Sequence, residues 1–395
     1  MKRVACFLLI AIPMVVFAQK AIKPNLNKAL NSWKQGKLDE AKQMIDVCVT
    51  DPKLSLDAKT FFYQGLIYAS IDTTSNAIYK GLSDNGFEVA VQAFAKAADM
   101  NKTSKNELFY QSDSFLPVTL SQSVEYLSNY YLNKGAVAYQ DDDYETALKE
   151  FDKTKILSPK DTTAHFYAGF VAQANDEYDR ALENLEKYIQ LGGTSSDAHT
   201  VMIQTWAGPK GDKKKALELT RQAKAKFPKN KDYALLEIGY LIDLDMTEDA
   251  KGGLEKAVAA DPSNKTLLFY LGYVNSKLNN FDEAKKNFET ALKIDPMYFD
   301  AQYYLAQLYF IEADKVKAEM NNLGISAADK KRKIELDAEL VKRYKAAAPY
   351  WERAEQLNPS ETDVLDKLSM IYYYLGEDAK AARVEKRLKE LGVDN

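Results

Sequence analysis

The sequence predicts an all-helical repeat fold, because one residue pattern returns along the chain at a fixed spacing. In the second half, small residues and prolines recur every 34 residues, at Ala216, Ala250 and Ala284, then Ala223, Ala257 and Ala291, then Pro228, Pro262 and Pro296. The same spacing within one unit recurs as Ala147, Thr154 and Pro159 and as Ala347, Ala354 and Pro359. Such a period indicates one supersecondary unit stacked many times.

Each period predicts two antiparallel helices that cross closely. Gly272 and Ala284 are small where the two backbones approach, and Phe288 fills the groove beyond them. Pro296 cannot continue a helix and restricts Asp295 before it to an extended conformation, so the second helix ends there. Six prolines are expected to follow second helices in this way: Pro52, Pro159, Pro228, Pro262, Pro296 and Pro359.

The segment from Lys265 resembles the tetratricopeptide repeat. Its matching residues are Leu268, Leu271, Gly272, Ala284, Phe288, Ala291 and Pro296, and Asn275 departs from the pattern where the family prefers an aromatic residue. The resemblance implies an α-α superhelix, a solenoid of about nine helical hairpins. We place the hairpins at residues 21–52, 56–102, 128–160, 161–193, 194–229, 230–261, 262–295, 296–358 and 359–391.

Four segments are expected along the chain. Residues 1–18 form a signal peptide, residues 19–104 hold N-terminal repeat-like pairs, residues 105–127 form a connector that contains Pro117, and residues 128–395 form the main array. The connector has room for a helix of its own and could separate two sub-arrays.

The first residues predict export. Lys2 and Arg3 supply a charged start, residues 4–17 are uncharged and mostly apolar, and Ala18 ends a stretch suited to cleavage. This run of 14 residues is shorter than the roughly 20 residues of a membrane-spanning helix. We therefore expect a mature chain that starts at Gln19, lacks a transmembrane segment, and resides in the periplasm or, otherwise, outside the cell.

The net charge limits the classes of partner, and the cysteine content limits disulfide bonding. Without Lys2 and Arg3, 51 basic residues face 57 acidic ones, and 51 minus 57 is −6, which does not favour nucleic acid or anionic lipid as partners. Loss of Cys6 with the signal peptide leaves Cys48 as the only cysteine, so no intrachain disulfide is expected.

The eighth hairpin carries a charged insertion. Ala347 lies 29 residues later than the period allows, and Ser326 followed by Asp329 is a helix start of the capping-box kind. The pattern predicts one helix from Ser326 to Gln356 and an extended hairpin around residues 312–346. Two interpretations stay open: a solvated hairpin, or a docking arm for a partner or a second copy of the chain.

The resemblance also places the expected binding surface, because the inner faces of first helices in this family line a groove that takes peptides or a partner's helix. Tyrosine suits such a surface, since it offers apolar area and a hydroxyl group at small entropic cost. Packing between helices is the alternative role for each ring. The aromatic residues expected to bind a partner are Phe62, Tyr63, Phe166, Tyr167, Phe170, Tyr240, Phe269, Tyr270, Tyr273, Tyr303, Tyr304 and Tyr373.

Catalytic patterns are not expected. His165 and His199 are the only histidines, and neither a His-Glu-x-x-His zinc motif nor a Gly-x-Ser-x-Gly elbow occurs. We therefore expect no enzyme activity, no cofactor and no metal. The leading hypothesis is a non-catalytic scaffold that binds a protein or peptide in the bacterial cell envelope. The alternatives are a glycan or cell-wall binding module, suggested by the same aromatic residues, and an enzyme that uses carboxylates within the groove. The oligomeric state stays open.

Overall fold

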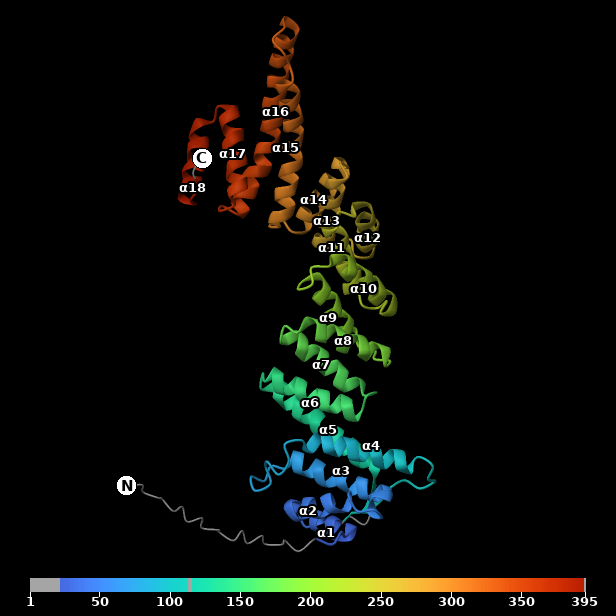
Figure 1. Ribbon diagram of the computed structural model, residues 1–395. Coiled ribbons are helices and arrows are strands. Elements are labelled where there is room, and N and C mark those ends of the chain that lie inside the picture. The colour runs from blue at the N-terminus through green and yellow to red at the C-terminus, as the bar shows by residue number, and fades with distance from the viewer. Residues whose placement is uncertain (1–21, 113–115, 394–395) are drawn as a thin grey trace, which may run out of the picture. The chain divides into compact units, whose positions relative to one another are not determined.

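The computed structural model describes residues 22–112 and 116–393. Within them the chain forms 18 α-helices, one short 3₁₀ helix and one two-stranded sheet (Figure 1). The predicted all-α fold of helical hairpins is confirmed. The expected signal peptide at residues 1–18 lies outside the described residues. None of the helices in the described part is both long and apolar enough to cross a membrane.

The chain divides into two compact units, one that ends at Thr194 and one that begins at Ser195. In both units, each odd-numbered helix packs on the even-numbered helix that follows it, and that helix packs on the next odd-numbered one. The predicted boundaries at residues 104 and 127 do not coincide with this division, and the four-segment organisation stays a prediction.

The first unit stacks four helical hairpins. A short 3₁₀ helix, η1 (Leu54–Leu56), precedes the second of them. The hairpins are α1 (Leu26–Lys34) with α2 (Leu38–Cys48), α3 (Ala58–Thr73) with α4 (Gly86–Asn101), α5 (Leu120–Gln140) with α6 (Tyr144–Leu157), and α7 (Thr162–Ala174) with α8 (Tyr178–Gln190).

The second unit stacks five. They are α9 (Ser196–Ala207) with α10 (Lys213–Lys226), α11 (Asp232–Asp243) with α12 (Thr247–Ala260), α13 (Lys265–Lys277) with α14 (Phe281–Ile294), α15 (Phe299–Asn321) with α16 (Ala327–Leu357), and α17 (Thr362–Leu375) with α18 (Asp378–Glu390). All six prolines that were expected to follow second helices do so, shortly after α2, α6, α10, α12, α14 and α16.

Small residues set the helix crossings, as predicted. Ala284 and Phe288 of α14 are fully buried, and a Cβ atom on Gly272 of α13 would lie 2.6 Å from the Phe288 ring. Gly135 stands in the same relation to Phe151, with a distance of 2.7 Å. Because a glycine on the first helix leaves room for a large side chain from the second, the two backbones approach closely.

The turns within hairpins share one backbone conformation. Eight of the nine connections between paired helices contain a residue with positive φ, namely Gly36, Gly81, Asp142, Asp176, Gly211, Asp245, Asn279 and Gly376. Glycine, asparagine and aspartate tolerate this left-handed conformation best. Asp143, in the acidic run after α5, accepts a hydrogen bond from the Thr146 backbone as the N-cap of α6. The run is therefore a helix start.

The expected connector is shorter than predicted. It contains an antiparallel pair of strands, β1 (Phe109–Gln111) and β2 (Pro117–Thr119), in which Phe109 lies opposite Thr119. Helix α5 begins at Leu120 rather than at Ser128, because Thr119 and Gln122 form a reciprocal capping box. Leu127 and Tyr131, buried on the same helix face, then hold this early start against the core.

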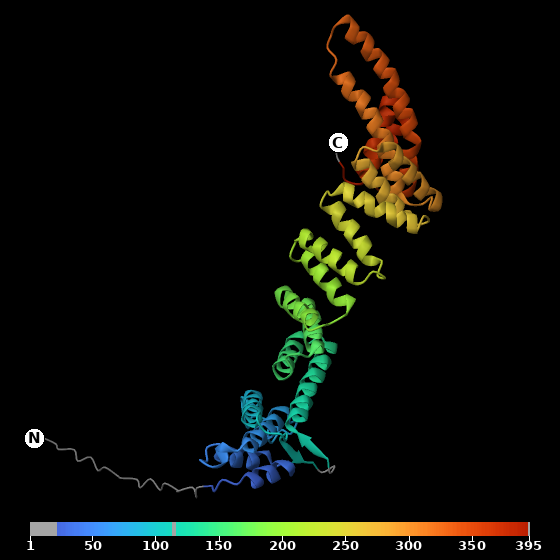
Figure 2. The same cartoon turned by 90° about the vertical axis from the view of Figure 1, so that its right-hand side faces the viewer.

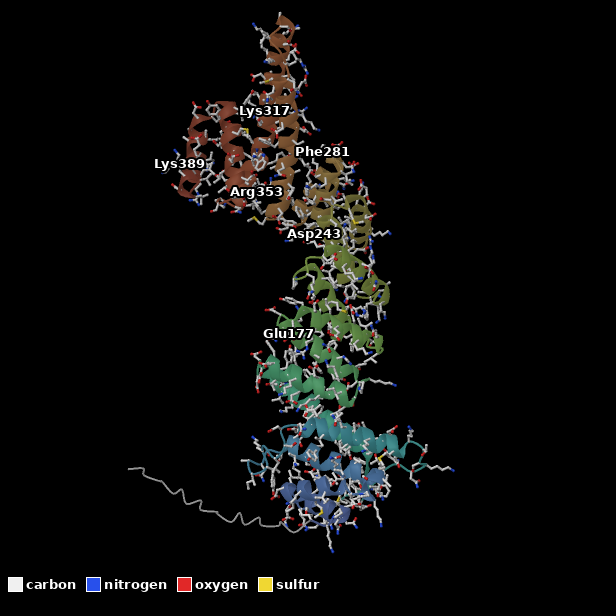
Figure 3. All side chains as sticks on the ribbon, viewed as in Figure 1. Glu177, Asp243, Phe281, Lys317, Arg353 and Lys389 are labelled. Carbon is white, nitrogen blue, oxygen red and sulfur yellow. The ribbon has the colours of Figure 1, made fainter. Side chains whose placement is uncertain are left out.

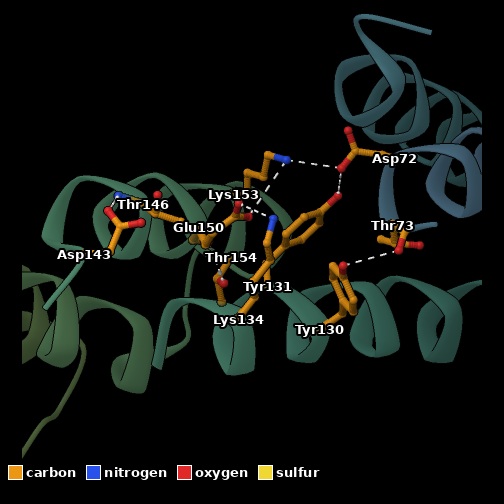
Figure 4. Close-up of polar contacts among 10 residues, drawn as sticks. All are labelled: Asp72, Thr73, Tyr130, Tyr131, Lys134, Asp143, Thr146, Glu150, Lys153 and Thr154. Atoms are coloured by element: carbon orange, nitrogen blue, oxygen red, sulfur yellow. Dashed lines mark hydrogen bonds and ion pairs between the residues drawn. The ribbon is translucent and has the colours of Figure 1, made fainter. Parts of the chain in front are cut away.

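A buried polar cluster ties the second hairpin to the third (Figure 4). The Tyr131 hydroxyl of α5 donates to Asp72 of α3, and Lys153 of α6 lies 3.1 Å from the same carboxylate. Glu150, whose side chain is 4 % exposed, binds Lys134 at 2.7 Å. Burial and the Asp72 hydrogen bond both raise the pKa of Tyr131. These contacts cross the expected connector, so the hairpins before and after it belong to one unit.

The extended hairpin forms as predicted. Helix α16 has 31 residues, and Ser326 and Asp329 form its capping box. Helices α15 and α16 run side by side beyond their neighbours in the second unit (Figures 1 and 2). Leu340 and Tyr344 are fully buried, and the Tyr374 hydroxyl of α17 donates to Asp337 at 2.8 Å. Lys317, labelled in Figure 3, contacts Met370 of α17. The hairpin is thus packed along part of its length and solvated near its turn.

Candidate functional site

The predicted aromatic residues of α3 are core residues. Phe62 has no exposed surface and Tyr63 is 8 % exposed. The Phe62 ring contacts Tyr63, Phe94 and Tyr110, with ring centroids 5.8 to 6.3 Å apart. The prediction that these two side chains face a groove is therefore wrong, because the second hairpin uses them to fill its own interior.

The three predicted residues of α7 do come together. Phe166 and Phe170 have ring centroids 4.5 Å apart, and Phe166 also contacts Tyr188 of α8 at 5.1 Å. Tyr167, 39 % exposed, stacks on the buried Phe151. This cluster keeps partly exposed rings on the surface of the first unit, but none of the cavities found here is lined by them.

Most predicted rings on α13 and α15 pack against one another. Tyr304 lies at the centre, with centroids 5.5 Å from Phe269, 5.3 Å from Tyr273 and 5.5 Å from Tyr303. Phe269 is 8 % exposed and belongs to the core, which corrects its predicted role. The Tyr303 hydroxyl donates to Asp363 at 2.7 Å. Tyr373 of α17 is 76 % exposed and lines none of the cavities described here.

Two of the predicted residues share a hollow. Tyr240 of α11 and Tyr270 of α13 line a cavity of about 630 Å³, which we call the α11–α13 cavity. Tyr270 is 41 % exposed, and burial raises the pKa of Tyr240, with Asp243 adding to the shift. The remaining lining residues are mostly aliphatic: Leu235, Leu236, Ile238, Ile242, Leu254 and Leu267, with Gly239 and Thr266.

Acidic side chains stand at the edge of this cavity. Asp232 begins α11 and Asp243, labelled in Figure 3, ends it, and both line the hollow. Asp243 binds Lys213 at 2.7 Å. Within the described residues Asp232 forms no ion pair. An apolar floor beside an acidic edge suits an apolar group that carries a positive charge next to it.

A second cavity adjoins the first. It measures about 930 Å³ and lies among α10, α11 and α12, and we call it the α10–α12 cavity. Leu235, Ile238, Asn264 and Leu267 line both cavities. The second cavity is more charged, because Arg221 and Lys224 both bind Glu237 along its wall. Leu235, 47 % exposed, separates the two hollows.

Glycines in α11 and α12 leave space for the two cavities. Gly239 and Gly252 would meet no heavy atom within 4 Å if each carried a Cβ atom. At the crossing of α13 with α14, the small residue is Gly272 and the large one is Phe288. The equivalent residues of α11 and α12, 34 positions earlier, are Ile238 and Leu254, so the glycine–phenylalanine pair is absent there. A Cβ on Gly253 would lie 3.2 Å from Ile238. Sequence reasoning missed this site, although the glycines inside α11 and α12 were a visible signal.

Each of the two histidines lies on the first helix of a hairpin, His165 on α7 and His199 on α9. His165 belongs to the first unit and His199 to the second. Burial lowers the pKa of both, and nearby lysines lower it further. His199 Nδ1 lies 3.1 Å from the Ser195 carbonyl oxygen. Across the described residues, no group of three or more metal-ligating side chains gathers.

Comparison with known proteins gives one family match. The tetratricopeptide repeat family matches residues 266–298, which take in α13, α14 and the turn after them. No curated protein matches the chain.

The chain also shows similarity to several solved structures, among them those of three proteins. The crystal structure of YrrB, a TPR protein with an unusual peptide-binding site, is 20% identical over 54% of this chain and 98% of its own, with a TM-score of 0.38. Pseudomonas aeruginosa pilF is 19% identical over 58% and 91%, with a TM-score of 0.41. MamA is 19% identical over 43% and 92%, with a TM-score of 0.38. The family match thus shows one tetratricopeptide repeat, at residues 266–298, and the recurring glycine, alanine and proline positions show that other hairpins of the chain repeat its spacing.

Proposed function

We propose that this protein is a non-catalytic scaffold of the bacterial cell envelope, and that it holds a protein or peptide partner in the α11–α13 cavity. The observation that carries the proposal is the cavity itself, which combines a hollow of about 630 Å³, an aliphatic floor and two tyrosines. Pockets that bury a ligand group have volumes of roughly 300–1,000 Å³ and place a few polar groups around apolar walls.

The lining favours a peptide over a glycan. Sugar rings need flat, exposed aromatic faces and many hydrogen-bonding groups, whereas six of the lining residues are aliphatic. Tyr240 and Tyr270 can hold the two sides of an inserted side chain. Because Asp232 lines the cavity and forms no ion pair within the described residues, the preferred ligand is an apolar side chain that neighbours a lysine or arginine.

Two glycine substitutions test the site. Gly239→Phe places a ring in the α11–α13 cavity, and Gly252→Phe places the same ring in the α10–α12 cavity, in each case at a helix position with open space. A peptide library is probed with the chain lacking residues 1–18. We expect selected peptides to bind the parent and the Gly252→Phe variant and to lose affinity for Gly239→Phe. Unchanged binding by Gly239→Phe would contradict the proposal.

Crosslinking in cells tests the partner's class. A photoreactive residue at Tyr270 is compared with one at Tyr126, a tyrosine that is 59 % exposed on α5 and lines none of the cavities. Capture of one dominant protein from Tyr270 and not from Tyr126 is expected. Capture of glycan alone would favour the cell-wall alternative instead.

The envelope location rests on the first 18 residues and is tested separately. Cell fractionation should place the protein in the periplasm, and mass spectrometry of the mature N-terminus should find Gln19. Recovery from the cytoplasm with an intact Met1 would disprove the location, and the cavity proposal would stand independently of it.

A further inference from the structure

The turn of the α15–α16 hairpin carries apolar side chains that nothing covers. Ile325 is 89 % exposed and Ile334 is 73 % exposed. The neighbouring Met320 and Leu323, by contrast, pack against the hairpin's own core. We call residues 322–334 the arm tip. Exposed isoleucines at such a projecting turn cost solubility, so they point to an apolar environment that the tip meets elsewhere.

Basic side chains surround these isoleucines. Residues 330–333 read Lys-Lys-Arg-Lys. Lys330 and Lys331 lie four and three positions before Ile334 on α16, so all three share one helix face. Arg332 binds Glu319 and Glu335, and Asp329 is engaged with Ser326 in the capping box. Lys330, Lys331 and Lys333 form no ion pair within the described residues.

From this geometry we infer that the arm tip binds the surface of an anionic lipid membrane. The isoleucines enter the boundary between headgroups and acyl chains, while the three lysines contact the lipid phosphates. A protein that binds a membrane through one weak apolar group dissociates readily. A second feature, such as a cluster of basic residues, makes the membrane binding stable. The tip holds both features close together, because the eight steps along the helix from its N-cap Ser326 to Ile334 rise by about 12 Å.

An acidic protein is a poorer occupant of this surface. A stable protein interface buries about 800 Å² on each partner and is shaped to match it. The arm tip is one turn with the first residues of one helix, and it lines neither the α11–α13 cavity nor the α10–α12 cavity. A fluid lipid surface needs no matching shape.

The charge of the whole chain does not oppose this binding. Acidic residues outnumber basic ones overall, which by itself disfavours anionic lipid. However, charges separated by more than about 8 Å are largely screened at physiological ionic strength. Helix α16 is about 46 Å long, so the charge near the tip, not the total, decides what the tip meets.

Vesicle sedimentation tests the inference. The chain lacking residues 1–18 is mixed with vesicles of phosphatidylcholine, with or without phosphatidylglycerol. Near an anionic surface each lysine contributes about fivefold to binding, equivalent to about 1 kcal/mol. Replacing Lys330, Lys331 and Lys333 with glutamine should therefore weaken binding to the anionic vesicles about a hundredfold. The same change at Lys28, Lys37 and Lys59, which are exposed and form no ion pair within the described residues, is the matched control, which should bind as the parent does.

A second readout reports insertion. A polarity-sensitive dye on a cysteine at position 325 should shift to the blue on anionic vesicles and not on neutral ones, whereas a cysteine at Tyr126 should show no shift. Cys48 is buried and does not compete for the dye. Three results would each overturn the inference: no binding to anionic vesicles, equal loss in the control with Lys28, Lys37 and Lys59 replaced, or binding without a blue shift. Capture of an acidic protein by a tip that ignores vesicles would assign the surface to that partner.

Discussion

Replacing Gly272 with alanine should destabilise the protein, although alanine is the better helix former. Gly272 lies inside α13, where alanine alone would stabilise the helix by about 0.5–1 kcal/mol. The new Cβ atom, however, would lie 2.6 Å from Cε1 and 2.7 Å from Cδ1 of Phe288. Carbon atoms rest at about 3.5–4.0 Å, so the ring must move by about 1 Å.

Phe288 has nowhere to move. It is fully buried, and its ring contacts Phe269 at 5.9 Å and Tyr304 at 6.1 Å. Overpacking of this kind costs about 1–3 kcal/mol, so Gly272→Ala should lower the free energy of unfolding by about 1 kcal/mol net. Gly239→Ala is the control, because its Cβ meets no atom within 4 Å, and it should raise stability by about 0.5–1 kcal/mol.

The two variants are compared by urea unfolding and by hydrogen exchange. Exchange in α13 and α14 is needed because repeat arrays need not unfold in one step. Adding Phe288→Leu to Gly272→Ala removes the clashing ring atoms, so the two substitutions should couple favourably by about 1–2 kcal/mol. If Gly272→Ala proves as stable as Gly239→Ala, or if the double variant is additive, the close glycine–phenylalanine crossing does not govern the hairpin.

Further predictions concern the polar cluster, the turns and alkaline pH. Lys153→Met should destabilise the first unit by about 3 kcal/mol in urea unfolding, because it removes the shared cation of the Asp72 and Glu150 carboxylates and leaves Asp72 with the neutral Tyr131 hydroxyl alone. Lys102→Met, in an exposed pair with Asp99, should cost less than about 1 kcal/mol. Asn279 has a φ of 61°, so Asn279→Gly should be tolerated and Asn279→Val should lower the thermal midpoint at a cost of about 1–2 kcal/mol. A hydrogen bond with Tyr309, together with burial, raises the pKa of Tyr350 to about 12 from its ordinary value of 10.0. The neutral form of Tyr350 therefore stabilises the fold below pH 10, and this contribution is lost as the pH rises toward 12. A spectrophotometric titration should follow the ionisation of Tyr350, and circular dichroism should follow the loss of structure. Both signals of this residue should be absent from Tyr350→Phe.

The sequence predicted the hairpins well because their determinants are local and periodic. Small residues at the crossing and a proline after the second helix act within one 34-residue unit, so the residues of a single repeat determine the geometry of its hairpin. The 31-residue length of α16 also followed from local features, namely the Ser326–Asp329 cap and the delayed Ala347. These signals need no knowledge of the neighbouring hairpins.

Features that depend on distant residues were not predictable in this way. The pairing of β1 with β2, which precedes α5, joins segments that carry no repeat pattern. The cluster of Asp72, Tyr131 and Lys153 joins positions that are 59 and 81 residues apart. Anionic lipid was disfavoured as a partner through the net charge of the whole chain, which hides the local group of lysines at residues 330–333.

The position of the candidate site shows why aromatic residues alone were a poor guide to it. Stacked hairpins leave gaps between helices that only large side chains fill, so Phe62, Phe269 and Tyr304 pack inward and contact other rings. A hollow opens instead where filling side chains are absent, as at Gly239 and Gly252. Such a hairpin gives up packing energy, because empty space forfeits van der Waals contacts. That loss is recovered when a ligand occupies the space, which is why the least filled hairpin of the second unit is the best candidate for binding.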